Sequence, residues 1–252
     1  YYKRVGKETE RIQMIPKKIH YCWFGGKDLP EEAKRCIASW KKYCPDYEII
    51  EWNEKNYDVN KIPYTKYCYE NKKWAFLTDY IRLDVIYSEG GIYLDTDVEL
   101  VKSLDDLLNC ECYIGMEQVG TINTGQGFGA IKNNEFIKEN KEYYETHEFL
   151  DSNGEFIRTI CVEITTNILK KYGLKKENKI QILNGINIYP TDYFCPKKMG
   201  TNKITITNNT YSIHHFESSW KSKNKIIRKI SYYLIPIKQL VKRMKKNVEK
   251  NQ

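Results

Sequence analysis

The chain has 252 residues, a formal net charge of +8 and no run of about 18 apolar residues, which argues against a membrane-spanning helix. Residues 221–252 contain eleven Lys or Arg and one Glu, a net charge of +10, so residues 1–220 carry −2. The basic character belongs to the C-terminal tail, and a nucleic-acid-binding body is the poorest fit to this composition.

The first part of the chain alternates between strand and helix patterns. We expect strands over residues 17–23 and 48–52. Between them we expect a helix over residues 31–42, and Pro30 marks its start. Polar turn residues follow over 53–60. Repeated βα units of this kind predict an α/β fold with a mostly parallel sheet.

A longer helix is expected over residues 74–88. Its apolar residues recur at the spacing of one buried helical face, at Phe76, Tyr80, Leu83 and Tyr87. Asp79 and Arg82 are three residues apart, so their side chains share a face and can reach one target together. For this pair in isolation, an ordinary ion pair within the helix is the favoured interpretation.

Gly90 and Gly91 predict a tight turn into a short apolar strand over residues 91–94. Asp95 and Asp97 follow at the carboxyl end of this strand, where open α/β sheets bind their ligands. Residues i and i+2 of a strand point to the same face, so both carboxylates can address one cation. Hard oxygen ligands of this kind suit Mg²⁺ or Mn²⁺.

The rest of the body continues the mixture of helices and strands. Residues 113–131 combine glycines with short apolar runs, which indicates strands around a ligand loop. We expect helices over residues 135–144 and 156–172. Short strands are expected over residues 203–207 and 211–214.

Three blocks occur in order over residues 14–220: IPKKIHYCWFGG at 15–26, TDYxRL with GGxYLDxD at 78–97, and HHFESSW at 214–220. Together they resemble glycosyltransferase family 32, which includes bacterial capsular polysaccharide transferases. They are also similar, more distantly, to the catalytic domain of the large clostridial glucosylating toxins. This resemblance implies the GT-A type of nucleotide-diphosphate-sugar transferase fold, with helices flanking the sheet.

The resemblance also implies roles for individual residues. Asp97 is the direct metal ligand, and Asp95 faces the ribose and the sugar. Asp79 and Arg82 hold hydroxyl groups of the donor sugar. His215 stands where the toxins carry an acidic residue, so we expect an imidazole ligand that favours Mn²⁺ over Mg²⁺.

The closing block adds two further residues by the same resemblance. Ser218 is expected beside the metal and the donor, and the indole N–H of Trp220 is expected to donate to a diphosphate oxygen. Trp23 is expected to stack on the base, which favours a UDP-sugar over GDP-mannose. Alternatively, Trp23 is buried at a strand end and Trp220 anchors the tail. Strand alternation turns His214 away from the metal, where it packs.

Signals for the acceptor are weaker. Asn123 and Gln126 lie in a polar, Gly-rich loop that we expect to line the sugar cleft, and Glu163 falls where relatives bind acceptors. The loop lacks the lysine of a phosphate-binding P-loop. The resemblance implies transfer with retention of anomeric configuration, for which no nucleophile is assigned.

Residues 221–252 predict a basic amphipathic helix that Pro236 kinks or splits. Helices with this pattern lie in the surface of anionic membranes. We expect the tail to hold the transferase domain, residues 1–220, on the inner face of the plasma membrane beside a polyprenyl-diphosphate-linked acceptor. The alternative is a helix that packs on the domain.

Cysteine spacing and the N-terminus bear on the compartment. The eight cysteines lack the paired C-x-x-C spacing of a zinc site. The N-terminal residues lack the apolar core of a secretory signal. We therefore expect reduced thiols in a cytoplasmic protein.

Three classes of function fit these patterns. The first is a metal-dependent retaining glycosyltransferase that extends a capsular or other surface glycan. The second is a Mg²⁺-dependent nucleotidyltransferase or hydrolase, which gives no shared role to Asp79, Arg82, Trp23 and Trp220. The third is a non-catalytic glycan-binding protein, and the usable residue types at every matched position argue against it.

Overall fold

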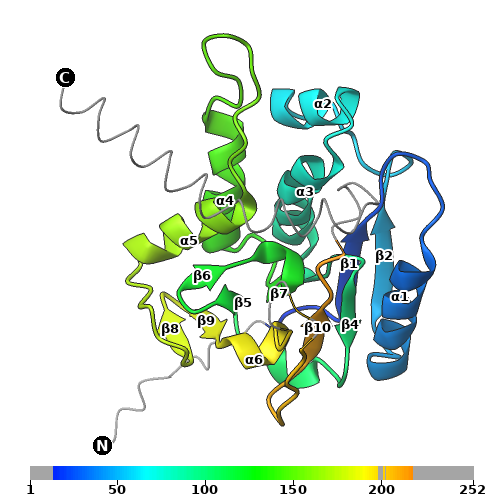
Figure 1. Ribbon diagram of the computed structural model, residues 1–252, viewed down its shortest axis with the longest axis vertical. Coiled ribbons are helices and arrows are strands. Elements are labelled where there is room, and N and C mark those ends of the chain that lie inside the picture. The colour runs from blue at the N-terminus through cyan, green and yellow to red at the C-terminus, as the bar shows by residue number, and fades with distance from the viewer. Residues whose placement is uncertain (1–13, 198–200, 202, 218–252) are drawn as a thin grey trace, which may run out of the picture.

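The structure, a computed structural model, describes residues 14–197, 201 and 203–217. At its centre is one large sheet, flanked by helices (Figure 1). The strands of this sheet are β1 Lys18–Cys22, β2 Glu48–Trp52, β3 Gly91–Tyr93, β5 Cys112–Gln118, β6 Thr121–Ile122, β7 Phe128–Ala130, β8 Gln181–Leu183 and β9 Ile186–Tyr189. A second, two-stranded sheet pairs β4 Val98–Leu100 with β10 Ser212–His214.

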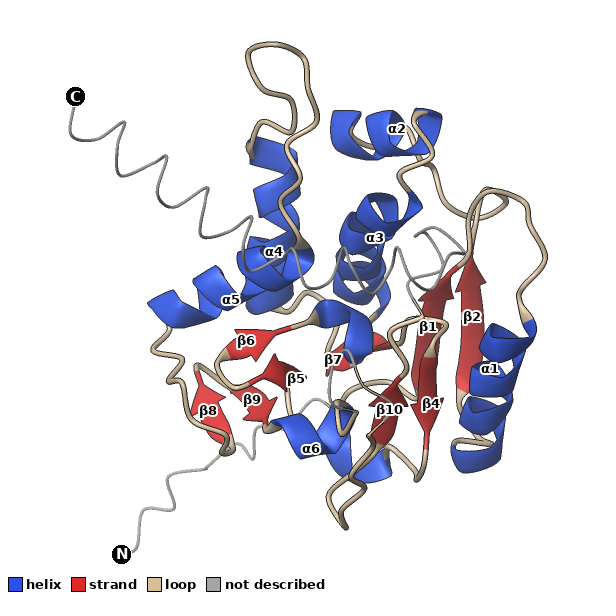
Figure 2. Ribbon diagram, viewed as in Figure 1, coloured by secondary structure: helices blue, strands red, loops and turns tan. Residues whose placement is uncertain are grey.

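The large sheet has the strand order β2-β1-β3-β7-β5-β9-β8, with β6 paired to β5. Five of its eight strands, β1, β2, β3, β5 and β9, run in one direction, and the other three run against them (Figure 2). This confirms the predicted α/β class with a mostly parallel sheet. The helices are α1 Glu31–Tyr43, α2 Pro63–Glu70, α3 Trp74–Glu89, α4 Glu135–Thr146, α5 Cys161–Lys171 and α6 Thr191–Phe194.

The sheet is buried on both faces because its strands alternate between two apolar clusters. On β3, Tyr93 packs on the side of α3, α4 and α5, whereas Ile92 packs on the side of α1. On β5, Ile114 packs on the side of α3, α4 and α5, and Tyr113 packs on the side of α1. The strands are therefore rigidly held, and the loops at their carboxyl ends start from fixed positions.

Chain order creates a crossover point at β1. From β1 the chain passes through α1 on one face to β2, and it returns through α2 and α3 on the other face to β3. β1 therefore lies between β2 and β3, and the connections diverge beyond its carboxyl end. Open α/β sheets bind ligands at such a point. Gly25 and Asp95 both follow strands that end there.

A glycine pair makes the sharp reversal from α3 into β3. Gly90 has a φ of 68° and ends the helix, and Gly91 has a φ of 106°. A Cβ at Gly91 would lie 2.9 Å from the carbonyl oxygen of Lys18. The predicted turn is confirmed, because only glycine adopts this backbone at such close approach.

The predicted helices and strands of the first half are confirmed with ends shifted by one or two residues. The strand expected over residues 203–207 is wrong, since only an isolated bridge between Lys197 and Ile204 occurs there. No sequence pattern predicted α2, β4, β8, β9 or α6. Among the described residues, no helix has the length and apolar character needed to cross a membrane. The predicted tail helix lies outside the described residues.

Candidate functional site

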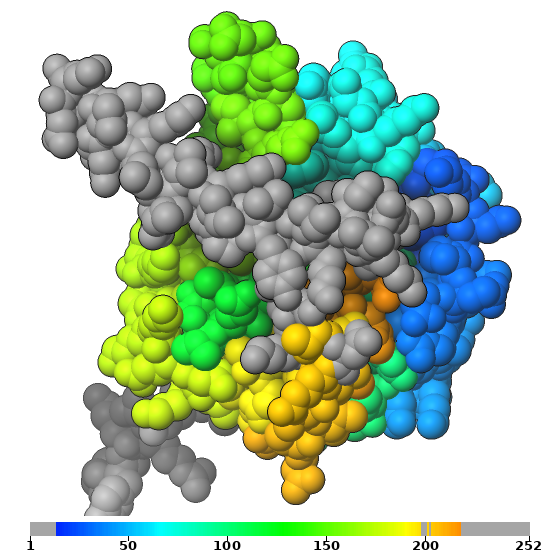
Figure 3. Space-filling view, in the orientation of Figure 1, coloured from blue at the N-terminus to red at the C-terminus, as the bar shows by residue number. Residues whose placement is uncertain are grey.

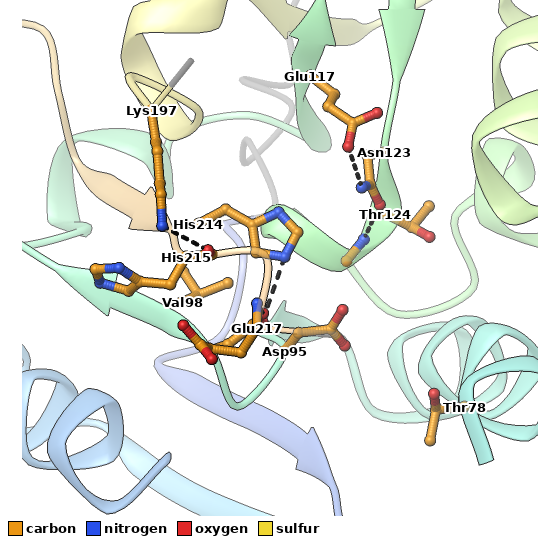
Figure 4. Close-up of polar contacts among 12 residues, drawn as sticks. Thr78, Asp95, Val98, Glu117, Asn123, Thr124, Lys197, His214, His215 and Glu217 are labelled. Carbon is orange, nitrogen blue, oxygen red and sulfur yellow. Dashed lines mark hydrogen bonds and ion pairs between the residues drawn. The ribbon is translucent and has the colours of Figure 1, made fainter. Parts of the chain in front are cut away.

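Three side chains from two distant parts of the chain meet beyond the carboxyl end of β3. One ligand atom each from Asp95, Asp97 and His214 lies within 4.8 Å of the others. His214 reaches this place because β10 pairs antiparallel with β4, which puts His214 opposite Val98. Figure 4 shows the His214 ring on the side of Asp95. Two carboxylates and an imidazole form a donor set that fits Mn²⁺ and similar cations.

Asp97 and His214 form a buried pair, with Nε2 3.3 Å from Asp97 Oδ1. Burial raises the pKa of Asp97, but His214 and the backbone N–H of Glu217 outweigh it and lower the pKa to about 2. That N–H donates to Asp97 Oδ2 at 2.8 Å. Burial lowers the pKa of His214, yet Asp97 and the other nearby carboxylates raise it overall. Asp97 is therefore ionised at neutral pH.

Arg82 links this cluster to α3. Its guanidinium lies 3.3 Å from Asp95 Oδ1 and 3.1 Å from Asp79 Oδ1, and it sits 5.0 Å from the ring centre of Tyr93. The side chain is only 4% exposed, and the two carboxylates help to raise its pKa well above the ordinary value. The predicted pair of Asp79 and Arg82 is thus present. Arg82 also contacts Asp95, so the pair is more than an isolated ion pair within the helix.

Burial opposes the charge of both carboxylates that hold Arg82. It raises the pKa of Asp79 to about 6, although Arg82 and hydrogen bonds from Cys161 act in the other direction. Cys161 is the first residue of α5, so Asp79 lies at the start of that helix. Burial likewise raises the pKa of Asp95, whose Oδ1 accepts the Tyr93 hydroxyl at 3.0 Å.

The loop before β7 presses its backbone against Asp95. A Cβ at Gly125 would lie 2.3 Å from Asp95 Oδ2 and 3.0 Å from Arg82 Nη1, so no larger residue fits there. The side chain of Asn123 holds this loop, because its Oδ1 accepts the Gly125 N–H at 2.7 Å. Its Nδ2 donates to Glu117 Oε1 at 3.1 Å (Figure 4). Burial raises the pKa of Glu117.

The structure reverses the roles expected for two neighbouring histidines. His215 was the predicted ligand, but its Nε2 lies 2.7 Å from Glu99 Oε2, and its carbonyl oxygen accepts the Lys197 Nζ at 2.7 Å. His214, which was expected to pack away, faces Asp97 instead. Strand alternation correctly separates the two side chains, but only the pairing of β10 with β4 decides which one faces the site.

The predicted acceptor residues have three different environments. Asn123 lies at the site, where it connects Glu117 to the loop before β7. Gln126 is fully buried, so its side chain does not line an open cleft. Glu163 lies exposed in the first turn of α5, and its role stays a prediction.

The predicted aromatic contacts to the donor are only partly within the described residues. Trp23 is half-buried against the cluster on the α1 side, and its indole N–H donates to the Lys27 carbonyl oxygen at 2.5 Å. Ser218 and Trp220 lie outside the described residues.

Sequence reasoning missed Tyr93, Glu117 and Gly125. A signal exists for Tyr93, since it stands two residues before Asp95 on the same strand face. None exists for Glu117, which reaches the site only through the pairing of β5 with β6 and β7.

The comparisons with known proteins agree with this geometry. Residues 30–114 match the family described as "Glycosyltransferase sugar-binding region containing DXD motif". The matched segment makes up about a third of the chain's 252 residues. Asp95 and Asp97 are the two acidic residues of its Asp-x-Asp motif.

Two curated relatives show how far the likeness extends. The chain is 31% identical over 108 residues to "Inositol phosphoceramide mannosyltransferase 3" of Schizosaccharomyces pombe, which covers 40% of this chain and 29% of that protein. It is 23% identical over 226 residues to "Uncharacterized glycosyltransferase L373" of Acanthamoeba polyphaga mimivirus, covering 82% and 84%. The chain spans well under half the length of most curated relatives that it matches.

A solved structure supports the fold. The chain superimposes on "PaToxG Glycosyltransferase" with a TM-score of 0.50 and 22% sequence identity, over 63% of this chain and 69% of that one. At this level of identity the likeness concerns the fold alone. It agrees with the GT-A type that the sequence motifs predicted.

Proposed function

We propose that this protein is a metal-dependent glycosyltransferase that moves a sugar from a nucleoside diphosphate donor to a glycan acceptor. The observation that carries the proposal is the cluster of Asp95, Asp97 and His214 beside the pair of Arg82 and Asp79. The family of residues 30–114 and the relative named as a mannosyltransferase support a hexose as the transferred group.

Some residues of the site act on the diphosphate leaving group, and others bind the sugar. Asp95, Asp97 and His214 would hold a divalent metal, which would supply Lewis-acid chemistry at the diphosphate of the donor. Arg82 adds a fixed positive charge that two carboxylates keep in place. Oxygens of Asp79 and Asp95 accept hydrogen bonds from sugar hydroxyls, which fixes the donor in one orientation and lowers the entropic barrier.

We propose transfer with retention of configuration, and a capsular or other surface glycan as the acceptor. A half-buried carboxylate, Glu117, and the amide of Asn123 border the site and suit polar acceptor groups. The sequence favours a UDP-sugar on the strength of Trp23, with GDP-mannose second.

The basic tail supports a place at a membrane surface. Each basic residue near an anionic bilayer contributes about 1 kcal/mol, and residues 221–252 carry a net charge of +10. We propose that this segment holds the enzyme at the inner face of the plasma membrane, beside a lipid-linked acceptor. Co-sedimentation with anionic vesicles, compared between the full chain and a chain ending at residue 217, tests this. Equal binding of both would contradict it.

The proposed activity has a direct test. The full chain is incubated with UDP-, GDP- and CDP-sugars, with and without Mn²⁺, and unfolding temperature and release of nucleoside diphosphate are measured. A true donor stabilises the folded state by mass action and releases its nucleotide only with the metal. Asp97→Asn should abolish both effects, and Asp105→Asn is the matched control, because Asp105 pairs with Lys17 away from the site. Stabilisation by none of the donors would contradict the proposal.

A further inference from the structure

A groove of about 490 Å³ opens beside the loop that follows β1. This volume falls within the range of small-molecule sites. The groove shares no residue with the Asp95 cluster or with the pair of Asp79 and Arg82. It is lined by Gly25, Gly26, Glu54, Tyr69, Glu70, Lys72 and Trp74.

The groove has fixed walls. Gly25 has a φ of +93°, and a Cβ there would lie 2.9 Å from the Trp74 ring, so the loop packs directly on the indole. The Gly25 N–H donates to Glu54 Oε1 at 2.7 Å, and the Tyr69 hydroxyl donates to the same oxygen at 3.4 Å. The rings of Tyr69 and Trp74 meet edge to face at 5.5 Å. Two aromatic rings and one positioned carboxylate therefore surround the opening.

One face of α3 connects the groove to the metal cluster. Trp74, Thr78 and Arg82 are spaced by four residues, so they follow one another along that face. The helix rises 1.5 Å per residue, which puts Arg82 about 12 Å from Trp74 along the axis. Arg82 Nε donates to the Thr78 carbonyl oxygen at 3.0 Å, and Thr78 itself is half-exposed between the two ends. A ribose and diphosphate span a path of this kind.

We propose that this groove holds the base of the donor nucleotide and that Glu54 selects guanine. The inference rests on the proposed function, because the base belongs to the same donor. Glu54 Oε1 is occupied by Gly25 and Tyr69, whereas Oε2 has no hydrogen-bond partner among the described residues. Guanine presents two adjacent donors, N1–H and the 2-amino group, which match a carboxylate. Uracil flanks its one N–H with carbonyl oxygens, which a carboxylate repels.

This assignment differs from the stacking on Trp23 that the sequence motif suggests. Trp23 packs with the apolar cluster on the α1 side of the sheet, while Trp74 packs with the cluster on the α3 side. The Trp23 indole N–H is already used by the Lys27 carbonyl oxygen. Trp74 also stands on the helix that carries Asp79 and Arg82, so a base beside it is in line with the metal cluster.

The test measures binding of GDP, inosine diphosphate and UDP to the full chain in Mn²⁺ by isothermal titration. Inosine diphosphate differs from GDP only by the missing 2-amino group. We expect GDP to bind at least tenfold more tightly than the other two. Glu54→Gln keeps an acceptor for Gly25 but replaces the free oxygen by a donor, so it should remove most of the preference for GDP over inosine diphosphate. Glu70→Gln, a second carboxylate of the same groove, is the matched control and should keep the preference.

Two further variants separate the aromatic assignments. Trp74→Leu should weaken the binding of all three nucleotides, whereas Trp23→Leu should leave the affinity for each of them unchanged. Tightest binding of UDP, an unchanged ratio in Glu54→Gln, or a lost ratio in Glu70→Gln would overturn the role of Glu54 and leave the transferase proposal standing. Binding of none of the nucleoside diphosphates would overturn both proposals.

Discussion

Two regions build the site, and they differ in how much of their geometry is local. The first, residues 74–97, carries Asp79 and Arg82 on one helix and Asp95 just after the next strand. The second, residues 211–217, brings His214 from more than a hundred residues away through the pairing of β10 with β4. The space-filling view shows this second, orange region set among earlier segments of the chain (Figure 3). Helical and strand spacing fix the first region, whereas only tertiary pairing fixes the second.

The largest expected effect lies in the first region. Asp97→Asn removes one negative ligand charge where the diphosphate departs, and loss of one group that stabilises developing charge costs about 10²–10³-fold in rate. We expect at least this loss of transfer, together with a lower unfolding temperature, because the variant also removes the charge that pairs with His214. The measurement is nucleotide release under limiting Mn²⁺. Full activity of Asp97→Asn under limiting Mn²⁺ would contradict the assignment of Asp97 as a metal ligand.

A backbone contact from the loop before β7 to the first region should have the next largest effect. Gly125→Ala places a Cβ where Asp95 Oδ2 and Arg82 Nη1 now lie. The carboxylate must move, and we expect a loss of about 10–100-fold in transfer, comparable to that of other groups that position a metal site. Rate and metal affinity are measured together. An unchanged rate would show that the loop does not constrain Asp95.

A smaller effect is expected where the second region is held in place. Lys197→Met removes the hydrogen bond to the His215 carbonyl oxygen, and hydrogen bonds from a charged group contribute about 1.5–3 kcal/mol. Lys197 contacts the backbone of His215, next to the proposed ligand His214, and not the ligand itself. We therefore expect metal affinity to fall by about tenfold. Lys203→Met changes an exposed lysine and serves as the control. Equal effects of the two variants on metal affinity would show that Lys197 does not help to position the site.

Acid should affect the two regions in different pH ranges. Burial lowers the pKa of His20 to about 4, and the neutral ring supports the turn into β3 by donating to the Gly90 carbonyl oxygen at 2.9 Å. The unfolded chain binds this proton near pH 6.5, so stability falls as pH drops from 6.5 to 4, by up to about 3 kcal/mol. The pKa of Asp97, about 2, preserves its contribution until the pH falls below about 4.

The measurement is the free energy of unfolding against pH for the wild type and for His20→Gln, which cannot titrate. The difference between the two should shrink between pH 6.5 and 4. A difference independent of pH would show that His20 keeps its ordinary pKa in the folded protein.

The sequence predicted the elements whose periodicity is local. The helix with Asp79 and Arg82, the glycine turn and the carboxylates after β3 were all found from spacing. The short strands β4, β8 and β9 have three or four residues each, too few for periodicity to show. The roles of His214 and His215 were exchanged for a related reason, because a one-residue change in register turns a side chain to the other face. Glu117 was missed because only sheet pairing brings it to the site.

The most direct test of this account is Mn²⁺ affinity in two neighbouring variants, measured by electron paramagnetic resonance with the full chain. His214→Gln removes the imidazole that faces Asp97, and His215→Gln removes the one that faces Glu99. We predict that His214→Gln weakens Mn²⁺ binding at least tenfold, since even groups that support ligands contribute about 10–100-fold. His215→Gln should change it less than threefold, within about 0.7 kcal/mol. The reverse order would contradict the assignment of His214 to the metal cluster.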